Sequence, residues 1–230
     1  VALALAGSAA AIYWHGRPAG QVVAALLLAL SYLAKQNGLA FGLLAAGYLL
    51  LVVGRRAWPF VVAFAVFAAV PTLLLQTSSG GWFATYVFGI AFASPTELGR
   101  ALYTLGAEVF GDMAVLAVMF LLLAASALVR YRSRVVQEQP WLLFIAAAIL
   151  ASVAGRASVG GARNQLMQAY AFLCLTPALL WREMASWRRP ERARTVVELA
   201  LLLQFGLTLL SPVGRLIRPE PPQHYVPTAA

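Results

Sequence analysis

The sequence contains few of the residues on which most soluble enzymes rely for catalysis or metal binding. Its 230 residues include one cysteine, two histidines and eight acidic residues, only one of which is aspartate. The histidines, His15 and His224, lie near opposite ends of the chain. A disulfide needs two cysteines, and metal clusters and Ser/His/Asp triads need several of these residues together. These kinds of site are therefore excluded, and the sequence implies neither a cofactor nor a divalent metal.

Charged residues are scarce as well, whereas apolar residues are abundant. Charged residues make up 11% of the chain and hydrophobic residues 62%, and the mean hydropathy is +0.80. A soluble domain is nearer half apolar and a quarter charged. The composition therefore predicts an integral membrane protein of the all-α class, folded as a polytopic helix bundle.

Eight apolar segments approach the length of a membrane-spanning helix, which is about 20 residues with a range of roughly 17 to 25. They cover residues 1–13, 19–34, 38–53, 57–76, 112–129, 140–155, 165–181 and 195–212. Because several are short, we expect about seven to eight transmembrane segments in a domain over residues 1–212, followed by a proline-rich extracytoplasmic tail over 213–230. The chain opens on Val1 inside an apolar run, so we expect a fragment whose N-terminal part is missing.

The basic residues divide the predicted turns into two sides. The net charge of +9 comes from 16 arginines and one lysine, which on a membrane protein indicates topology and phosphate contact rather than nucleic-acid binding. Eleven basic residues collect on one side, in the turns at Arg17, Arg55–Arg56, 130–134 and 182–194. Short basic loops stay cytoplasmic, where these arginines are expected to anchor the protein to lipid phosphates. The other side is then outward in a bacterial inner membrane, and it receives Lys35, loop 77–111, loop 156–164 and the tail.

Lys35 is the only lysine, and it interrupts two apolar segments. An ionisable residue at membrane depth is a functional candidate unless it extends to the lipid headgroups, which is the alternative interpretation. The neighbouring Gln36 and Asn37 add amide donors and acceptors that suit a phosphate or a sugar hydroxyl. Gly38 and Gly42 form a GxxxG motif, which is typical of close helix packing.

Loop 77–111 is long and rich in aromatic residues. Trp82, Tyr86 and their neighbours favour an amphipathic helix on the outer leaflet, either holding a lipid chain or forming an ordinary aromatic belt. Glu108 and Asp112 follow at a spacing of four residues, so both carboxylates share a helix face. Acid/base chemistry or a divalent metal would use such a pair. The simpler interpretation is that Asp112 caps the next helix and both acids complement its N-terminal dipole.

A third outward element covers residues 155–165. It combines Arg156 and Arg163 with glycines that let a ligand approach the backbone, and it ends in Asn164 and Gln165 at a predicted helix start. Such a combination suits an anion or a sugar, although a solvated turn would have the same composition.

Taken in order, these motifs resemble the C-terminal half of superfamily C glycosyltransferases. These are multi-spanning enzymes related to protein mannosyltransferases and aminoarabinose transferase, and they use dolichyl- or polyprenyl-phosphate sugars. The resemblance covers about residues 20–182. It is carried by residues 31–39, the Arg55–Arg56 turn, residues 79–83 with Tyr86, and residues 161–167.

The resemblance implies sugar transfer on the extracytoplasmic face, from a polyprenyl-phosphate-linked donor to a lipid, glycan or protein acceptor. Membrane lipids are the other expected partner. Lys35 would contact the donor phosphate, helped by Arg163 and Arg156. Residues expected to contact the substrate or the lipid carrier are Gln36, Asn37, Trp82, Tyr86 and Asn164. The family's acidic motif belongs to an earlier loop, upstream of Val1, so no catalytic residue is assigned and the chain alone is expected to be inactive.

Two other classes remain open. A transporter or flippase of a lipid-linked anion would also place a lone lysine and arginines beside interrupted helices. It would favour charges deep in several spans, whereas the apolar segments here are almost free of charge. A non-catalytic membrane scaffold would explain the apolar bulk, but it gives no reason for the polar residues that collect on one side.

Overall fold

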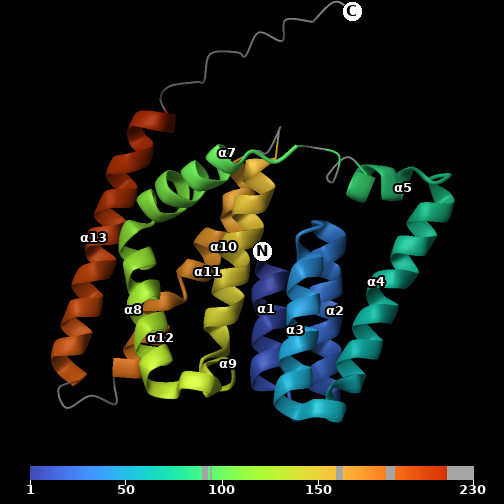
Figure 1. Ribbon diagram of the computed structural model, residues 1–230, viewed down its shortest axis with the longest axis horizontal. Coiled ribbons are helices and arrows are strands. Elements are labelled where there is room, and N and C mark those ends of the chain that lie inside the picture. Colours follow the sequence, from blue (N-terminus) through green and yellow to red (C-terminus); the bar gives the residue numbers. More distant parts are fainter. Residues whose placement is uncertain (90–92, 94, 159–162, 185–189, 217–230) are drawn as a thin grey trace, which may run out of the picture.

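The computed structural model describes residues 1–89, 93, 95–158, 163–184 and 190–216, and this part of the chain is almost entirely helical (Figure 1). No strand occurs among these residues, apart from an isolated antiparallel bridge between Thr96 and Ser158. The all-α prediction is therefore confirmed.

The long helices follow the predicted apolar segments closely. They are α1 (Ala2–Tyr13), α2 (Pro18–Ala34), α3 (Gly38–Val53), α4 (Trp58–Ser78), α8 (Ala114–Tyr131), α10 (Pro140–Ala157), α11 (Met167–Leu173), α12 (Thr176–Met184) and α13 (Pro190–Leu216). Shorter helices lie at the turns. These are η1 (Gly54–Ala57), α5 (Trp82–Ala84), η2 (Thr85–Gly89), α7 (Leu98–Tyr103), η3 (Thr104–Gly111), η4 (Arg132–Arg134), α9 (Val135–Glu138) and η5 (Arg163–Leu166).

Three helical stretches of the described chain are long and apolar enough to cross a membrane: Gly38–Ser78, Ala114–Glu138 and Pro140–Ala157. They support the prediction of a membrane protein. The number is smaller than the seven to eight spans expected from the sequence; α1 and α2, for example, are apolar but have only 12 and 17 residues. The stretch Gly38–Ser78 itself reverses direction near Gly54, where φ is 59°, so it forms the separate arms α3 and α4 (Figure 1).

The segment expected at 165–181 is divided into α11 and α12, and Pro177 explains the break. Proline has no N–H to donate to the carbonyl four residues earlier, which here belongs to Leu173. That carbonyl instead accepts a hydrogen bond from Thr176 Oγ1 at 2.6 Å. The chain therefore starts a new helix at Thr176 instead of continuing α11.

Successive long helices run in alternate directions, except that α11 and α12 follow one another in the same direction, so most turns collect at two opposite ends (Figure 1). The turn between α2 and α3 lies at the same end as α5 and α7. The arginine-bearing η1 and the α9 turn lie at the other end. This arrangement agrees with the two sides that the basic residues predicted. Loop 77–111 is mostly helical where it is described, and the tail from residue 217 onward lies outside the described residues.

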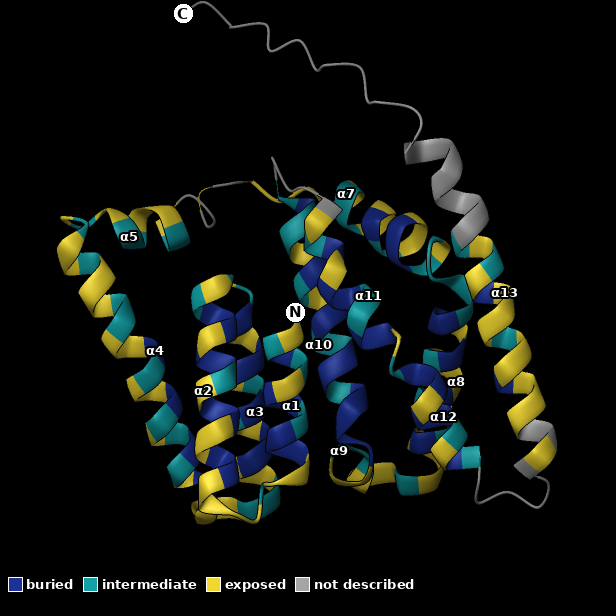
Figure 2. Cartoon of the chain, turned by 180° about the vertical axis from the view of Figure 1, so that it is seen from behind, coloured by how far each residue is buried: buried dark blue, intermediate teal, exposed yellow. Residues whose placement is uncertain are grey.

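The helices bury small and aromatic residues against one another and leave large apolar side chains on the outside (Figure 2). On α4, for example, Phe60 and Phe64 are buried, whereas Leu73 and Leu74 are more than 60% exposed. Outward-facing apolar residues of this kind are costly in water but suit contact with lipid.

The GxxxG prediction is confirmed, because both glycines lie where a side chain would collide with another helix. A Cβ atom on Gly42 would lie 1.9 Å from Cζ of Phe64 on α4. One on Gly38 would lie 2.4 Å from the backbone of Ser31 and Tyr32 at the end of α2. A third glycine of α3, Gly47, has open space around it.

We predict that Gly38→Ala destabilises the protein, because the new methyl group meets backbone atoms that have no rotamer to change. Overpacking of this kind costs about 1–3 kcal/mol. Chemical denaturation in detergent micelles, followed by tryptophan fluorescence, measures the loss. Gly47→Ala is the matched control in the same helix, and it should keep or slightly raise stability because alanine favours helix. Equal stability of the two variants would show that the Gly38 contact is not needed.

Candidate functional site

The turn after α2 contacts the start of η5, which is 129 residues further along the chain. Lys35 ends α2 in an extended conformation, with φ of −159° and ψ of 127°. Its Nζ atom donates a hydrogen bond to the backbone oxygen of Asn164 at 3.4 Å. The structure therefore brings together two of the three outward elements that the sequence singled out.

Aromatic packing below this contact holds the two elements in place. Phe41 on α3 stacks on Phe172 of α11, with ring centroids 5.0 Å apart. Tyr48, two turns further along α3, packs edge-on against Phe144 of α10. None of the four residues is more than 3% exposed, and such aromatic pairs contribute about 0.5–1.5 kcal/mol beyond their buried area. The position of Lys35 is thus set by the core rather than by its own side chain.

The charge of Lys35 has no carboxylate to balance it among the described residues, since the ion pairs found there join other side chains. Partial burial lowers the pKa of the Lys35 ammonium below the ordinary lysine value of 10.5, because the charged form loses hydration. Lys35 is therefore a partly buried cation for which the described residues supply no counter-charge.

Three side-chain amides gather two residues away from Lys35. Asn37 Nδ2 lies 3.4 Å from Oε1 of Gln165 and 3.4 Å from Oε1 of Gln168. Gln168 is buried, whereas Asn37 and Gln165 are partly exposed. Sequence reasoning had named Asn37 but not Gln168. The neighbouring Gln36, also expected at the site, is exposed and has no side-chain hydrogen bond among the described residues.

Arg156 lies at the same end of the molecule but is held by a carboxylate. Its Nη2 and Nε atoms contact the Glu108 carboxylate at 2.9 and 3.1 Å. The side chains of this pair are only 18% and 9% exposed. Arg156 therefore joins α10 to η3. The backbone of Arg163 belongs to η5, and its side chain lies outside the described residues.

The expectation that Asp112 caps the next helix is wrong. The N-cap of α8 is Met113, which makes no side-chain cap hydrogen bond. The Asp112 carboxylate instead accepts a hydrogen bond from the hydroxyl of Tyr170 on α11 at 3.0 Å. The reason is that residues 104–111 form a π-helix, which carries Asp112 to the end of η3 instead of the first turn of α8.

The aromatic residues of loop 77–111 lie at the same end of the molecule but apart from the lysine contact. Trp82 and Tyr86 are 61% and 65% exposed, and their ring centroids are 5.9 Å apart. They belong to α5 and η2, which follow the end of α4 on the far side of the molecule from α10 and α11 (Figure 1). These helices are placed as an interfacial helix would be, but the structure does not bring the two rings to η5.

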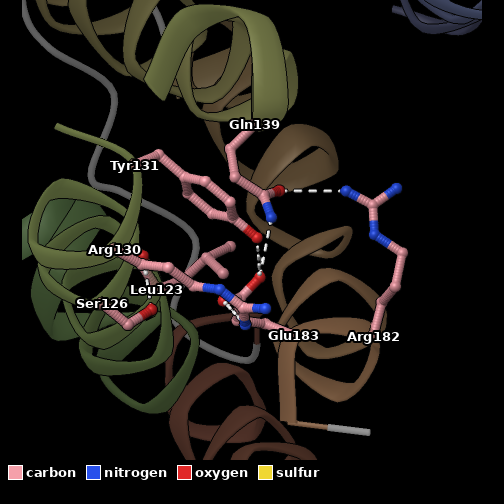
Figure 3. Close-up of polar contacts among 7 residues, drawn as sticks. All are labelled: Leu123, Ser126, Arg130, Tyr131, Gln139, Arg182 and Glu183. Carbon is pink, nitrogen blue, oxygen red and sulfur yellow. Dashed lines mark hydrogen bonds and ion pairs between the residues drawn. The ribbon is translucent and has the colours of Figure 1, made fainter. Parts of the chain in front are cut away.

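A second polar cluster, which sequence reasoning missed, is drawn in Figure 3. It lies near α9 and the end of α12, at the end of the molecule opposite α7 (Figure 1). The carboxylate of Glu183 on α12 is 4% exposed and pairs with Arg130 of α8 at 2.8 Å. It also accepts hydrogen bonds from Tyr131 at 3.1 Å and Gln139 at 2.9 Å. Gln139 in turn accepts one from Arg182 at 3.0 Å. The cluster joins α8, α10 and α12.

The sequence had assigned Arg182 and Glu183 to a membrane-surface anchor. The available signal was that Glu183 lies just after the predicted apolar segment 165–181, where an acidic residue needs a partner. Its partners are 44 to 53 residues away in sequence, so no local spacing identifies them.

Comparison with known proteins identifies no relative: no protein-family model, curated protein or solved structure matches the chain. The function is therefore argued from the chain's own residues.

We predict that Arg130→Met destabilises the protein more than Glu183→Gln. The arginine variant leaves a buried carboxylate without its cation, which costs about 3–5 kcal/mol. The glutamine variant leaves a guanidinium that is 49% exposed and can reach water, and it costs about 1–2 kcal/mol in lost hydrogen bonds. Denaturation of both variants and of the double variant in detergent measures the difference. The double variant should cost less than the sum, and strict additivity would mean that the two side chains do not interact.

Proposed function

We propose that this protein is an integral-membrane glycosyltransferase that uses a polyprenyl-phosphate sugar, and that Lys35 binds the phosphate of that donor. The observation that carries the proposal is the contact between the Lys35 turn and η5. It joins a lone cation to the Asn164 backbone and to neighbouring amides at one end of a helical membrane protein.

Electrostatics favours a phosphate over an uncharged ligand at this position. A phosphate oxygen would restore the charge balance that the described residues do not give Lys35. The nearby amides are able to bind the remaining oxygens or the attached sugar. A lysine that only extended to the headgroups would have no reason to pack against η5, 129 residues away.

The proposal also fixes an orientation. All eight apolar segments cross the membrane, the short ones within the bundle, where other helices satisfy their ends. The arginine-bearing turns at η1 and α9 are cytoplasmic, and the Lys35 turn faces outward, toward the periplasm or cell exterior. The acceptor is a lipid, a glycan or a protein on that face.

The other predicted residues take supporting roles in this proposal. Arg156, paired with Glu108, holds η3 against α10 and so supports the site from the side. Arg163 is the second cation for the phosphate. Trp82 and Tyr86 lie at headgroup level, where aromatic rings are favoured, and contact the lipid carrier rather than the phosphate.

A transporter or flippase of a lipid-linked anion is the alternative, and one observation favours it. Two ion pairs with buried carboxylates, Arg156 with Glu108 and Arg130 with Glu183, lie at opposite ends of the same group of helices. In a transporter, one such pair at each end would be able to break while the other stays closed, which would open the protein to one side of the membrane at a time. Proteoliposomes that contain the chain and a fluorescent polyprenyl phosphate distinguish the two functions, because only a flippase moves the lipid between leaflets.

We predict that Lys35→Ala weakens the binding of polyprenyl phosphate by about 10-fold or more, since a hydrogen bond to a charged group is worth about 1.5–3 kcal/mol. Native mass spectrometry of the chain in lipid nanodiscs measures the affinity. Lys35→Arg should retain part of it. Arg55→Ala, which removes an exposed cation at the other end of α3, is the matched control and should leave the affinity unchanged. Equal losses in the alanine variants would indicate general attraction to the basic protein, and no loss in either would remove Lys35 from the site.

Binding should also depend on pH in a defined direction. Burial lowers the pKa of Lys35 below 10.5, so the ammonium loses its proton earlier than an exposed lysine as the pH rises. The phosphate, with a second pKa of about 6, keeps its charge over this range. Affinity is therefore expected to be full at neutral pH and to fall with increasing alkalinity, beginning below pH 10.5. Lys35→Arg should abolish this fall, and a fall of the same size in that variant would assign it to another group.

A further inference from the structure

Two adjoining cavities form a single groove along α13. The first has a volume of about 770 Å³ and lies against the start of α8, and the second has a volume of about 550 Å³ and lies against α12. Both helices stand beside α13 (Figure 1). Cys174, Glu198 and Leu201 line both cavities, which are therefore continuous. This α13 groove has Arg194 at one end and Thr208 at the other.

Small side chains at the break between α11 and α12 leave this space open. Cys174 follows the last residue of α11, and Ala178 lies in the first turns of α12. Both are exposed and line the groove, and neither is large enough to fill it. On the opposite wall, Leu202 and Phe205 of α13 line the groove and are still 67% and 63% exposed. The groove is therefore open along one side to the surroundings of the protein, which in a membrane are lipid.

The polar side chains that line the α13 groove are already used within the protein. Gln204 Nε2 donates hydrogen bonds to the backbone oxygen of Asp112 at 3.1 Å and to Thr208 Oγ1 at 3.0 Å. Its Oε1 atom accepts one from a backbone N–H of α8 at 3.0 Å. Glu198 accepts one from Arg194 Nε at 2.6 Å. The other lining residues are hydrophobic, so the groove suits a hydrocarbon chain and would desolvate a polar ligand without replacing its hydrogen bonds.

The end of the groove at the start of α13 carries a cation. The side chain of Arg194 is 68% exposed, and no hydrogen bond of its Nη atoms is found among the described residues. A guanidinium presents such N–H groups as a planar fork that matches phosphate oxygens. Trp181 lines the same part of the groove, and tryptophan is favoured at headgroup level. The sequence over 182–194 adds to the positive charge, with five arginines against two glutamates.

We propose that the α13 groove binds one acyl chain of an anionic glycerophospholipid, with the phosphate of that lipid at Arg194. From Arg194 to Thr208 the helix rises about 21 Å, at about 1.5 Å per residue. One leaflet contributes about 15 Å to a hydrocarbon core of roughly 30 Å, so the groove is long enough for an acyl chain. An apolar groove with a cation at one end matches a lipid with one anionic headgroup, whereas an uncharged lipid would leave Arg194 without a partner for its Nη atoms.

This inference does not depend on the proposed function. Arg194 lies at the end of the molecule that carries η1 and α9, opposite the turn that contains Lys35 (Figure 1). The groove and the proposed donor site are therefore separate, and each is tested without the other.

The single cysteine gives a direct test, because its alkylation reports whether the groove is filled. The full chain in detergent is treated with N-ethylmaleimide, and mass spectrometry follows the modification of Cys174. Phosphatidylglycerol should slow the reaction at about 5-fold lower concentration than phosphatidylcholine with the same chains, the preference that one arginine near an anionic headgroup provides. In the control, Cys174→Ala with Leu73→Cys, the thiol lies on the exposed face of α4, and neither lipid should slow its reaction.

Variants separate the headgroup from general attraction to the basic protein. Arg194→Ala should remove the preference for phosphatidylglycerol while both lipids still slow the reaction. Arg55→Ala removes an exposed cation at the same end of the molecule but outside the groove, so it should keep the preference. Lys35→Ala should keep it as well, so a failure of the donor site does not affect this test. The denaturation midpoint of each variant confirms that it is folded.

Four results would overturn the inference. Equal protection by the two phospholipids would remove the phosphate from Arg194. Equal slowing at positions 73 and 174 would show that the lipid acts on the micelle and not on the groove. Protection by polyprenyl phosphate alone would assign the groove to a different lipid. Slowing that increases with protein concentration in the absence of lipid would identify a second copy of the chain as the occupant.

Discussion

The position of Lys35 depends on the close packing of Gly38 against the last turn of α2. The chain reverses there within a few residues, and any side chain at position 38 would meet the Ser31 and Tyr32 backbone at 2.4 Å. Because the turn is tight, α3 descends directly beside α2 and presents Phe41 to Phe172. These contacts hold the lysine turn against η5. The proposed phosphate site, the amides of Asn37, Gln165 and Gln168, and the order of the helices therefore share one steric constraint.

The second constraint is the pairing of charge in apolar surroundings. Glu108 and Glu183 are both buried, and each is paired with an arginine from another helix. One pair joins helices at each end of the molecule. Burying an ion is expensive unless its partner is close, so each pair also restricts how its helices are able to move. Lys35 stands apart because the described residues around it offer amides and a backbone carbonyl but no carboxylate, which is why we propose that a ligand balances its charge.

The sequence predicted the helices well and their interactions poorly. Apolar runs of spanning length mark the long helices to within a few residues, because membrane helices satisfy their backbone within the segment. The arginines predicted correctly which turns share an end of the molecule, because the basic content of each turn is read from a few neighbouring residues. The break at Thr176 was missed although Pro177 was visible, because a proline in a membrane helix more often bends it than ends it.

The site was predicted only in part, since its residues come from separate elements. Lys35, Asn37 and Asn164 were expected on one face, and the structure joins Lys35 to the Asn164 backbone and Asn37 to the neighbouring Gln165. Gln168 was not expected, because its only signal is a polar residue on a helix that faces α3. The partners of Glu108 and Glu183 lie 44 to 62 residues away, and one sequence does not pair positions over that distance. Trp82 and Tyr86 lie in a loop that has no described contact to η5. The aromatic content of this loop was the reason for expecting them to contact the lipid carrier.

The central claim is that Lys35 meets a lipid-linked phosphate, and the chain offers a direct way to observe it. Because Lys35 is the only lysine, protein labelled with ¹⁵N at lysine Nζ gives a single side-chain ammonium signal by NMR. On addition of polyprenyl phosphate to the protein in nanodiscs, this signal should shift and the pKa of Lys35 should rise, because the anion stabilises the protonated form. Polyprenol, which lacks the phosphate, should leave both unchanged. A signal and a pKa that respond equally to both lipids, or to neither, would contradict the assignment.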